Sequence, residues 1–323
     1  MARLRTLLSI VGTQGARGMT IALCIGVFVP VIWPGLGTAL RPSLPLMIAI
    51  FLVNAFAQLD LSYAKQSLTR PTRLLTATAW AMLAIPALFW VFLNTVGRDR
   101  FDPDFVLSLS LQAGAAPIMA TPAVALVLGI DATFAVLLLL ATMSIQPFTA
   151  PILVSWVAGT TIPIDGFVLG RNLFVMIGGS ALVAAGLRLW LGRARVEAYR
   201  SELTGINLMA FTLFGLAMFD GVVLKLFAEP ILLLGLSAVA FVIALGSLLI
   251  ATVSLRAMGA DEAFVTGFAT GHRNVGLMAA ALSGSSLPEL TWLYFALLQL
   301  PIYLTPQIVG AFAAARRSLR DRA

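Results

Sequence analysis

The segment GFATGHRNVG, residues 267–276, decides the fold that the sequence predicts. It places three glycines and the consecutive polar residues His272, Arg273 and Asn274 in the middle of an apolar stretch. Glycine weakens a helix by about 1 kcal/mol relative to alanine, and an arginine at mid-bilayer costs at least ~2.5–3.5 kcal/mol on insertion scales. The stretch is therefore expected to be a broken membrane helix whose polar part lines a cavity or contacts another protein segment.

A second apolar stretch contains a similar interruption, QAGAAPIMATPA at residues 112–123. Its two prolines, Pro117 and Pro122, and the glycine and alanines beside them disfavour a continuous helix. A segment with prolines and a threonine follows each interruption, at residues 146–151 and at residues 299–306. Glycine and proline are common in membrane helices, so each break taken alone could be a simple kink. Two breaks with similar neighbours favour an internal repeat.

The composition predicts an integral membrane protein. Of the 323 residues, 60% are hydrophobic and 11% are charged, whereas soluble domains carry about 25% charged residues. The apolar runs predict ten membrane spans, each about long enough to cross a hydrocarbon core of ~30 Å. These are Met19–Trp33, Leu44–Leu59, Leu74–Val96, Phe105–Leu128, Ala132–Ala158, Phe167–Trp190, Ile206–Leu226, Pro230–Leu255, Ala263–Gly284 and Leu290–Ala313.

The two halves are expected to form inverted five-helix repeats, because the interrupted spans lie five spans apart. The first repeat is expected at residues 19–158 and the second at 167–313. Residues 1–18 are basic and moderately amphipathic and resemble a signal peptide, but no small-residue cleavage site before a polar domain follows them. We therefore expect a cytoplasmic N-terminal segment with a retained first span, and a basic cytoplasmic tail at residues 314–323.

The basic residues predict that both termini are cytoplasmic. Of the 21 lysines and arginines, fifteen fall on the side of the N-terminus, five on the other side, and Arg273 falls inside a span. Such a bias marks the cytoplasmic side, and it also favours contacts with anionic lipid headgroups. The fifteen are Arg3, Arg5, Arg17, Lys65, Arg70, Arg73, Arg188, Arg193, Arg195, Arg200, Arg256, Arg316, Arg317, Arg320 and Arg322; the five are Arg41, Arg98, Arg100, Arg171 and Lys225.

At the two interruptions the chain resembles the bile acid:sodium symporter family. The segment 271–277, Gly-His-Arg-Asn-Val-Gly-Leu, is similar to the family's Gly-x-Gln-Asn-x-x-Leu. The stretch from the first break to Pro151 is similar to the family's Gly-Gly-Thr-x-Ser-Asn segment, its turn and its proline-ended helix, with the turn here at residues 129–131. Residues 58–61 give a weaker match.

The resemblance implies an all-α integral membrane fold of about ten transmembrane helices. In this fold, broken helices four and nine cross at their breaks inside a core domain that also contains spans three, five, eight and ten. Spans one, two, six and seven form a panel domain, and the substrate binds between core and panel.

The family's sodium ligands are largely missing here. The family has a Glu two residues before the motif glycine, where this chain has Ala269, and its Gln before Asn is Arg273. The family's Ser-Asn pair falls near Thr121, and among the polar positions of the fifth span Thr142 and Ser144 remain. Because sodium needs oxygen ligands, we expect no sodium coupling through the family's sites.

Arg273 has two functional roles open to it. Its guanidinium can bind an anionic substrate with two parallel hydrogen bonds, or it can replace a sodium charge and brace the crossing helices. The structural alternative is an arginine tied to backbone carbonyls. His272, the only histidine, could carry a coupling proton, since its ordinary pKa is ~6.5, or could be a neutral hydrogen-bonding residue.

The other candidates are polar residues near the breaks or in mid-span. The side-chain amides of Gln112, Gln146 and Gln299 could contact substrate or a neighbouring helix. Asp220 could pair with Arg273, gate access or mark the membrane interface, whereas Asp60 and Asp131 lie at span ends and are expected to be solvated. The full set of expected substrate- or ion-binding residues is His272, Arg273, Asn274, Thr121, Gln112, Gln146 and Gln299.

The sequence favours a secondary transporter of a small organic anion, working by alternating access in the cell membrane, coupled to protons or uncoupled. A sodium-coupled symporter with a different site, and a channel or uniporter, remain as alternatives. We expect no enzyme. A single histidine and Cys24, far from it in sequence, exclude most metal sites. An intramembrane aspartyl protease needs two aspartates within the membrane, and only Asp220 is a plausible candidate. We expect no cofactor and, since no nucleic-acid motif is present, no nucleic-acid partner.

The topology prediction can be checked with reporter fusions. Fusions after Val196 and after Ala323 should report a cytoplasmic location, and a fusion at Asp102 should report an external one. A cytoplasmic signal at Asp102 would rule out the ten-span arrangement.

The missing sodium ligands predict sodium independence. Transport or anion binding should change little when sodium is replaced by potassium or choline at equal ionic strength, because Ala269 offers no oxygen where the family has Glu. Strict dependence on sodium would mean that other residues bind the ion.

Overall fold

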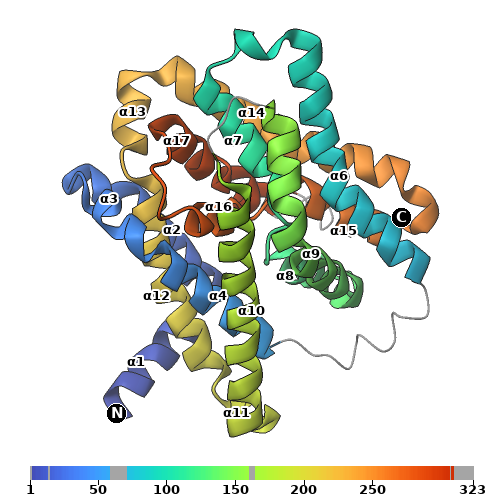
Figure 1. Ribbon diagram of the computed structural model, residues 1–323. Coiled ribbons are helices and arrows are strands. Elements are labelled where there is room, and N and C mark those ends of the chain that lie inside the picture. Colours follow the sequence, from blue (N-terminus) through green and yellow to red (C-terminus); the bar gives the residue numbers. More distant parts are fainter. Residues whose placement is uncertain (1, 14, 59–70, 160–163, 306, 309–323) are drawn as a thin grey trace, which may run out of the picture. The chain divides into compact units, whose positions relative to one another are not determined.

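The described part of the chain is all-helical and contains helices suited to a membrane. The computed structural model describes residues 2–13, 15–58, 71–159, 164–305 and 307–308, and helices joined by short connections make up most of them (Figure 1). Six of these helical segments are long and apolar enough to cross a membrane, which indicates a multi-pass membrane protein. They are Leu36–Gln58, Pro71–Val96, Ala132–Ala158, Gly166–Leu191, Arg200–Ala228 and Pro230–Ser254.

Five predicted spans coincide with uninterrupted helices. Proline does not stop all of them: α6 continues through Pro86, and α9 through Pro147 and Pro151. The five helices are α4 (Leu44–Gln58), α6 (Pro71–Val96), α9 (Ala132–Ala158), α10 (Gly166–Leu191) and α14 (Pro230–Ser254).

The first and seventh predicted spans are shorter or divided. The first lies in α2 (Gly15–Ile32), whose apolar part is Thr20–Ile32. The seventh divides into α12 (Arg200–Phe219) and α13 (Val222–Ala228), because Gly221 between them has φ +82°, a conformation that favours glycine. The remaining short elements are α1 (Ala2–Thr13), α3 (Leu36–Leu40), η1 (Arg41–Ser43), η2 (Arg98–Arg100), α11 (Arg193–Ala198) and η4 (Arg256–Met258).

The fourth, ninth and tenth predicted spans are built from short helices. The fourth contains α7 (Pro103–Gly114) and α8 (Thr121–Val127), and the ninth contains α15 (Ala260–Gly271) and α16 (Val275–Ala281). The tenth contains α17 (Glu289–Leu297), followed by helical residues 299–305. The predicted end of the tenth span at 309–313, the basic tail at 314–323 and Asp60 lie outside the described residues.

The chain divides into two compact units. The first unit comprises Met1–Leu59, Val168–Leu233 and Gly276–Ala296, and the second comprises Asp60–Phe167, Leu234–Val275 and Leu297–Ala323. This division differs from the expected core, since Gly276–Ala296, from the ninth and tenth spans, and the first residues of the eighth span belong to the first unit.

Specific contacts attach Gly276–Ala296 to the first unit. Arg41 lies 4.3 Å above the ring of Trp292, and Lys225 Nζ lies 3.5 Å from Glu289 Oε1. Asn172 also donates a hydrogen bond of 2.8 Å to the carbonyl of Ala281. These partners are far from the segment in sequence, so sequence periodicity could not assign it to a unit.

In the first unit, α12 packs against α1, α2, α3 and α4, and Figure 1 shows α1, α2 and α12 side by side. Glycines allow the close approach: a Cβ on Gly26 would lie 2.8 Å from the carbonyl carbon of Gly215, and a Cβ on Gly205 2.1 Å from the carbonyl oxygen of Leu8. Such backbone contact is a common way of packing membrane helices.

In the second unit, alanines pack several helices closely. Ala81 of α6, Ala135 of α9, Ala251 of α14 and Ala269 of α15 belong to one buried cluster. A second cluster joins Val124 and Leu128 to Phe268. These small and apolar side chains fix α15 against α6, α8 and α9 and so position the break that follows α15.

The close approach of α15 to α14 generates a stability prediction. A Cβ on Gly267 would lie 2.7 Å from the carbonyl oxygen of Leu248, too close without movement of the backbone. Gly267→Ala should therefore cost about 1–3 kcal/mol by overpacking, measured as a lower Tm of the purified protein in detergent.

The matched control is Gly246→Ala on α14, where no atom lies within 4 Å of the added Cβ. It should leave the Tm unchanged or raise it, because alanine is the better helix former. Equal losses of Tm in both variants would contradict the packing described for Gly267.

Candidate functional site

The two interrupted helices of the second unit are joined at their breaks by backbone hydrogen bonds. After α7 the chain is extended at Ala115, and after α15 it is extended at His272. Ile118 N–H donates to the carbonyl of His272 at 2.9 Å, and Asn274 N–H donates to the carbonyl of Ala116 at 2.8 Å. Pro117 and Arg273 therefore face each other as an isolated antiparallel bridge. We call this pairing of residues 115–118 with residues 272–274 the crossing.

The residue types at the crossing suit this geometry. In an antiparallel pair of this kind the flanking residues make the hydrogen bonds, so Pro117 occupies a place where no N–H is needed. Gly271 is required because a Cβ there would lie 2.4 Å from the carbonyl oxygen of Ala244. Pro122 stands in the first turn of α8, where proline is well tolerated. The sequence thus ends and restarts both helices at the place where they cross.

Arg273 places its guanidinium at this crossing. The residue is 2% exposed, and Nη1 donates a hydrogen bond of 2.9 Å to the carbonyl of Ala115. Its buried Nε and Nη2 make no hydrogen bond with the described residues. Within the described residues, Arg273 therefore uses only Nη1 as a hydrogen-bond donor.

The two remaining donor nitrogens lie on one edge of the guanidinium. Nε–H points away from Cδ, on the same side as Nη2, so the two groups present parallel N–H bonds. This edge matches the two oxygens of a carboxylate, and such paired hydrogen bonds to a charged group are stronger than neutral ones. The edge formed by Nε and Nη2 therefore has the geometry of a carboxylate-binding fork.

The opposite side of Arg273 contacts the end of α7. Ala115 is the C-terminal cap of this twelve-residue helix. The carbonyl groups at a helix C-terminus carry partial negative charge, which stabilises a nearby cation. Hence Nη1 holds the guanidinium against the end of α7.

His272 is held by two hydrogen bonds and a ring contact. Nδ1 lies 2.9 Å from the carbonyl of Phe268, which can only accept, so Nδ1 carries a hydrogen. Nε2 lies 3.1 Å from Oγ1 of Thr305, whose hydroxyl can donate. The imidazole also stacks on Phe268 with 4.0 Å between ring centroids. The neutral Nδ1–H tautomer completes both contacts, and so does the charged ring, because the Thr305 hydroxyl can also accept.

Asn274 and Thr121 lie beside the bridge. Asn274 is 6% exposed and is joined to the first break through its own N–H. Thr121 is 2% exposed, begins α8, and donates from Oγ1 to the carbonyl of Ile118 at 2.7 Å. Of the seven expected site residues, these two join His272 and Arg273 at the crossing.

The three glutamines are buried on separate elements of the second unit. Gln112 lies in the last turn of α7 and its carbonyl accepts from Ala115 N–H at 3.2 Å, which places it next to the crossing. Gln146 lies in the middle of α9, and Gln299 lies in the helical residues 299–305. All three are at most 4% exposed.

Asp220 has a structural role in the first unit. Its carboxylate accepts hydrogen bonds from Thr38 N–H at 2.7 Å, from Thr38 Oγ1 at 2.8 Å and from Gly35 N–H at 3.4 Å. These donors lie at the start of α3. Asp220 and these donors all belong to the first unit.

The positions considered for sodium ligands are apolar or bonded to their own helix. Ala269 is fully buried in the alanine-rich cluster. Thr142 donates from Oγ1 to the carbonyl of Leu138 at 2.7 Å, and Ser144 donates to the carbonyl of Leu140 at 2.7 Å. Across the described part of the chain, no three His, Cys, Asp or Glu side chains gather as metal ligands would.

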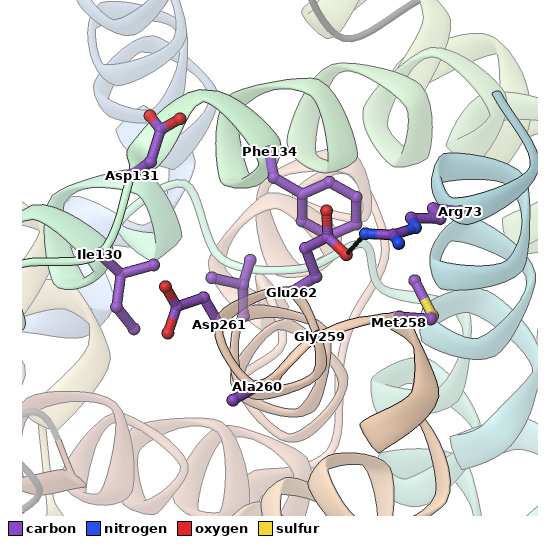
Figure 2. Close-up of a pocket in the computed structure, with 10 residues that line it drawn as sticks. Arg73, Ile130, Asp131, Phe134, Met258, Gly259, Ala260, Asp261 and Glu262 are labelled. Atoms are coloured by element: carbon purple, nitrogen blue, oxygen red, sulfur yellow. Dashed lines mark hydrogen bonds and ion pairs between the residues drawn. The ribbon is translucent and has the colours of Figure 1, made fainter. Parts of the chain in front are cut away.

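A separate pocket of about 390 Å³ opens in the second unit at the start of α15. Figure 2 shows Arg73 of α6 pointing toward Glu262, to which it is bound by an ion pair of 2.7 Å, while Asp131 and Asp261 lie apart from this pair. Asp131 is exposed, as the sequence predicted, and accepts from Thr133 N–H at 2.9 Å to cap α9. The ion pair ties α6 to α15.

Sequence reasoning missed the backbone and side-chain partners of the site. The carbonyls of Ala115 and Ala116 carry no signal in their side chains, although Pro117 marks an extended segment beside them. Thr305, the partner of His272, lies within the proline and threonine segment already noted at residues 299–306. That segment therefore contributes a contact to the site.

Comparison of the chain with protein-family models found no match, and comparison with curated proteins found no match either.

Proposed function

We propose that this protein is a secondary transporter of small organic anions, and that Arg273 binds the anion. The observation that carries the proposal is the free edge of Arg273. A guanidinium that is 2% exposed keeps Nε and Nη2 without an acceptor among the described residues. Buried donors without partners cost free energy, and charged ones cost most. A carboxylate bound in this fork would satisfy both donors and the charge together.

The surroundings of Arg273 support a site for a substrate that is released again. The neighbouring side chains of His272, Asn274 and Thr121 are neutral polar groups in the tautomer described, and none offers a permanent negative charge. Nη1 holds the guanidinium to Ala115, which fixes the direction of the fork. A fixed cation with uncharged neighbours can bind an anion without competition from a carboxylate of its own site.

The architecture proposed is that of two inverted five-helix repeats with a core and a panel, as in the bile acid:sodium symporter family. Three features support it: the apolar helices, the two interrupted helices that pair at their breaks, and the division into two units. The first unit contains the helices of predicted spans one, two, six and seven, and the second those of spans three, four and five and most of span eight, whereas spans nine and ten are divided between the units. Interrupted helices in corresponding halves are typical of carriers that work by alternating access.

The proposal places the protein in the cell membrane with both termini in the cytoplasm, among anionic lipids. It needs no sodium at the family's positions, since Ala269 packs among other alanines. A charged His272 would keep both of its contacts, because the carbonyl of Phe268 and the hydroxyl oxygen of Thr305 can each accept a hydrogen bond. The proposal therefore includes proton-coupled and uncoupled transport.

Substitution of Arg273 tests the binding role. Binding of labelled acetate, lactate and benzoate to the purified protein should weaken at least tenfold in Arg273→Lys, which keeps the charge and loses the planar fork. It should be abolished in Arg273→Gln, which loses the charge as well. Thermal unfolding of each variant is measured beside binding, because loss of the Nη1 contact alone lowers stability.

Arg200→Gln is the matched control, since its side chain is 65% exposed and pairs only with Glu197 among the described carboxylates. It removes one positive charge and should leave both binding and Tm unchanged. Undiminished binding in a stable Arg273→Gln protein, or no binding of the three anions to the unaltered protein, would refute the proposed site. Uptake into liposomes that shows no counterflow would indicate a channel.

A further inference from the structure

The charge of Arg273 has no counter-charge in the described part of the chain. Arg73 pairs with Glu262, Arg200 with Glu197, and Lys225 with Glu229 and Glu289, whereas Arg273 forms no hydrogen bond or ion pair with a described carboxylate. Arg273 instead contacts a backbone carbonyl, which is a dipole and carries no net charge. The site at the crossing therefore has a net positive charge when no anion is bound to it.

This charge has unequal consequences for the empty and the loaded carrier. An alternating-access carrier must pass through a state in which its site is closed to both sides of the membrane. In that state water no longer solvates the guanidinium, and a buried charge without a partner is costly. A bound carboxylate neutralises the charge and satisfies Nε and Nη2, so the same closed state is less costly for the loaded carrier.

We propose that the protein is an anion exchanger, in which the loaded carrier changes orientation readily and the empty carrier does so slowly. This inference rests on the proposed function, because it requires the anion to bind at Arg273. Exchange then moves one anion inward for each anion outward, without an ion gradient as the driving force. The residue that binds the substrate would also suppress net leakage of anions across the membrane.

Arg273 is well placed for this role because it is anchored. Nη1 is held by Ala115, and the backbone of Arg273 is paired with the other break. The side chain therefore has little freedom to extend toward water at either membrane surface, as a free arginine does. The positive charge remains at the crossing while the carrier is empty.

Proteoliposomes containing the unaltered protein test the inference. The initial uptake of labelled acetate, lactate or benzoate is compared between vesicles filled with the same unlabelled anion and vesicles without it, with the membrane potential clamped at zero. Uptake into the filled vesicles should be faster by about 100-fold, which corresponds to a barrier difference of about 2.7 kcal/mol. Protein-free vesicles give the background.

Arg273→Lys provides a second readout, because the ammonium keeps the positive charge. Its KM should rise while the preference for exchange over net uptake remains, an outcome that a purely structural role of Arg273 would not produce. Equal saturable uptake into filled and unfilled vesicles by the unaltered protein would overturn the exchanger and leave the anion carrier standing. Absence of anion binding to the unaltered protein would overturn both.

Discussion

The second unit depends on one constraint: backbone that leaves a helix in apolar surroundings must find hydrogen-bond partners elsewhere. Each unsatisfied N–H or C=O costs several kcal/mol in a medium without water. Here the two breaks satisfy each other through Ile118 with His272 and Asn274 with Ala116. Neither break could be stable alone, so α7, α8, α15 and the start of α16 form one structural element.

That mutual pairing also fixes the position of a charge. Arg273 is the residue facing Pro117 in the bridge, so its side chain starts from a backbone held on both sides. The Nη1 contact with Ala115 then directs the guanidinium and leaves the Nε and Nη2 edge free. Close packing around it is made possible by Gly271, which lies against the backbone of α14, and by Ala269 in the alanine-rich cluster. Packing and chemistry at this crossing are therefore inseparable, and a larger residue at either position would move the fork.

Proline illustrates how far sequence reasoning reaches. The same residue type stands at the break before α8 and within the continuous helix α9, at Pro147 and Pro151. In a membrane helix, neighbouring groups and local adjustment can satisfy the carbonyl that proline leaves without a donor. A helix therefore breaks where proline stands beside glycine or alanine and a partner segment supplies hydrogen bonds, as at Pro117. The local sequence does not reveal that partner segment.

The sequence by itself indicated a multi-pass membrane protein, the extent of five uninterrupted helices and the positions of two breaks, and it named seven polar residues that prove to be buried. It could do so because apolar runs, glycine and proline influence the backbone locally, and because a charge such as Arg273 in an apolar run must be buried or paired. Only the tertiary structure decided which groups meet: Thr38 with Asp220, Thr305 with His272, and Ala115 with Arg273. It also assigned Gly276–Ala296 to the first unit. These pairings join residues 33 to 182 positions apart, and such distant contacts depend on the packing of whole helices.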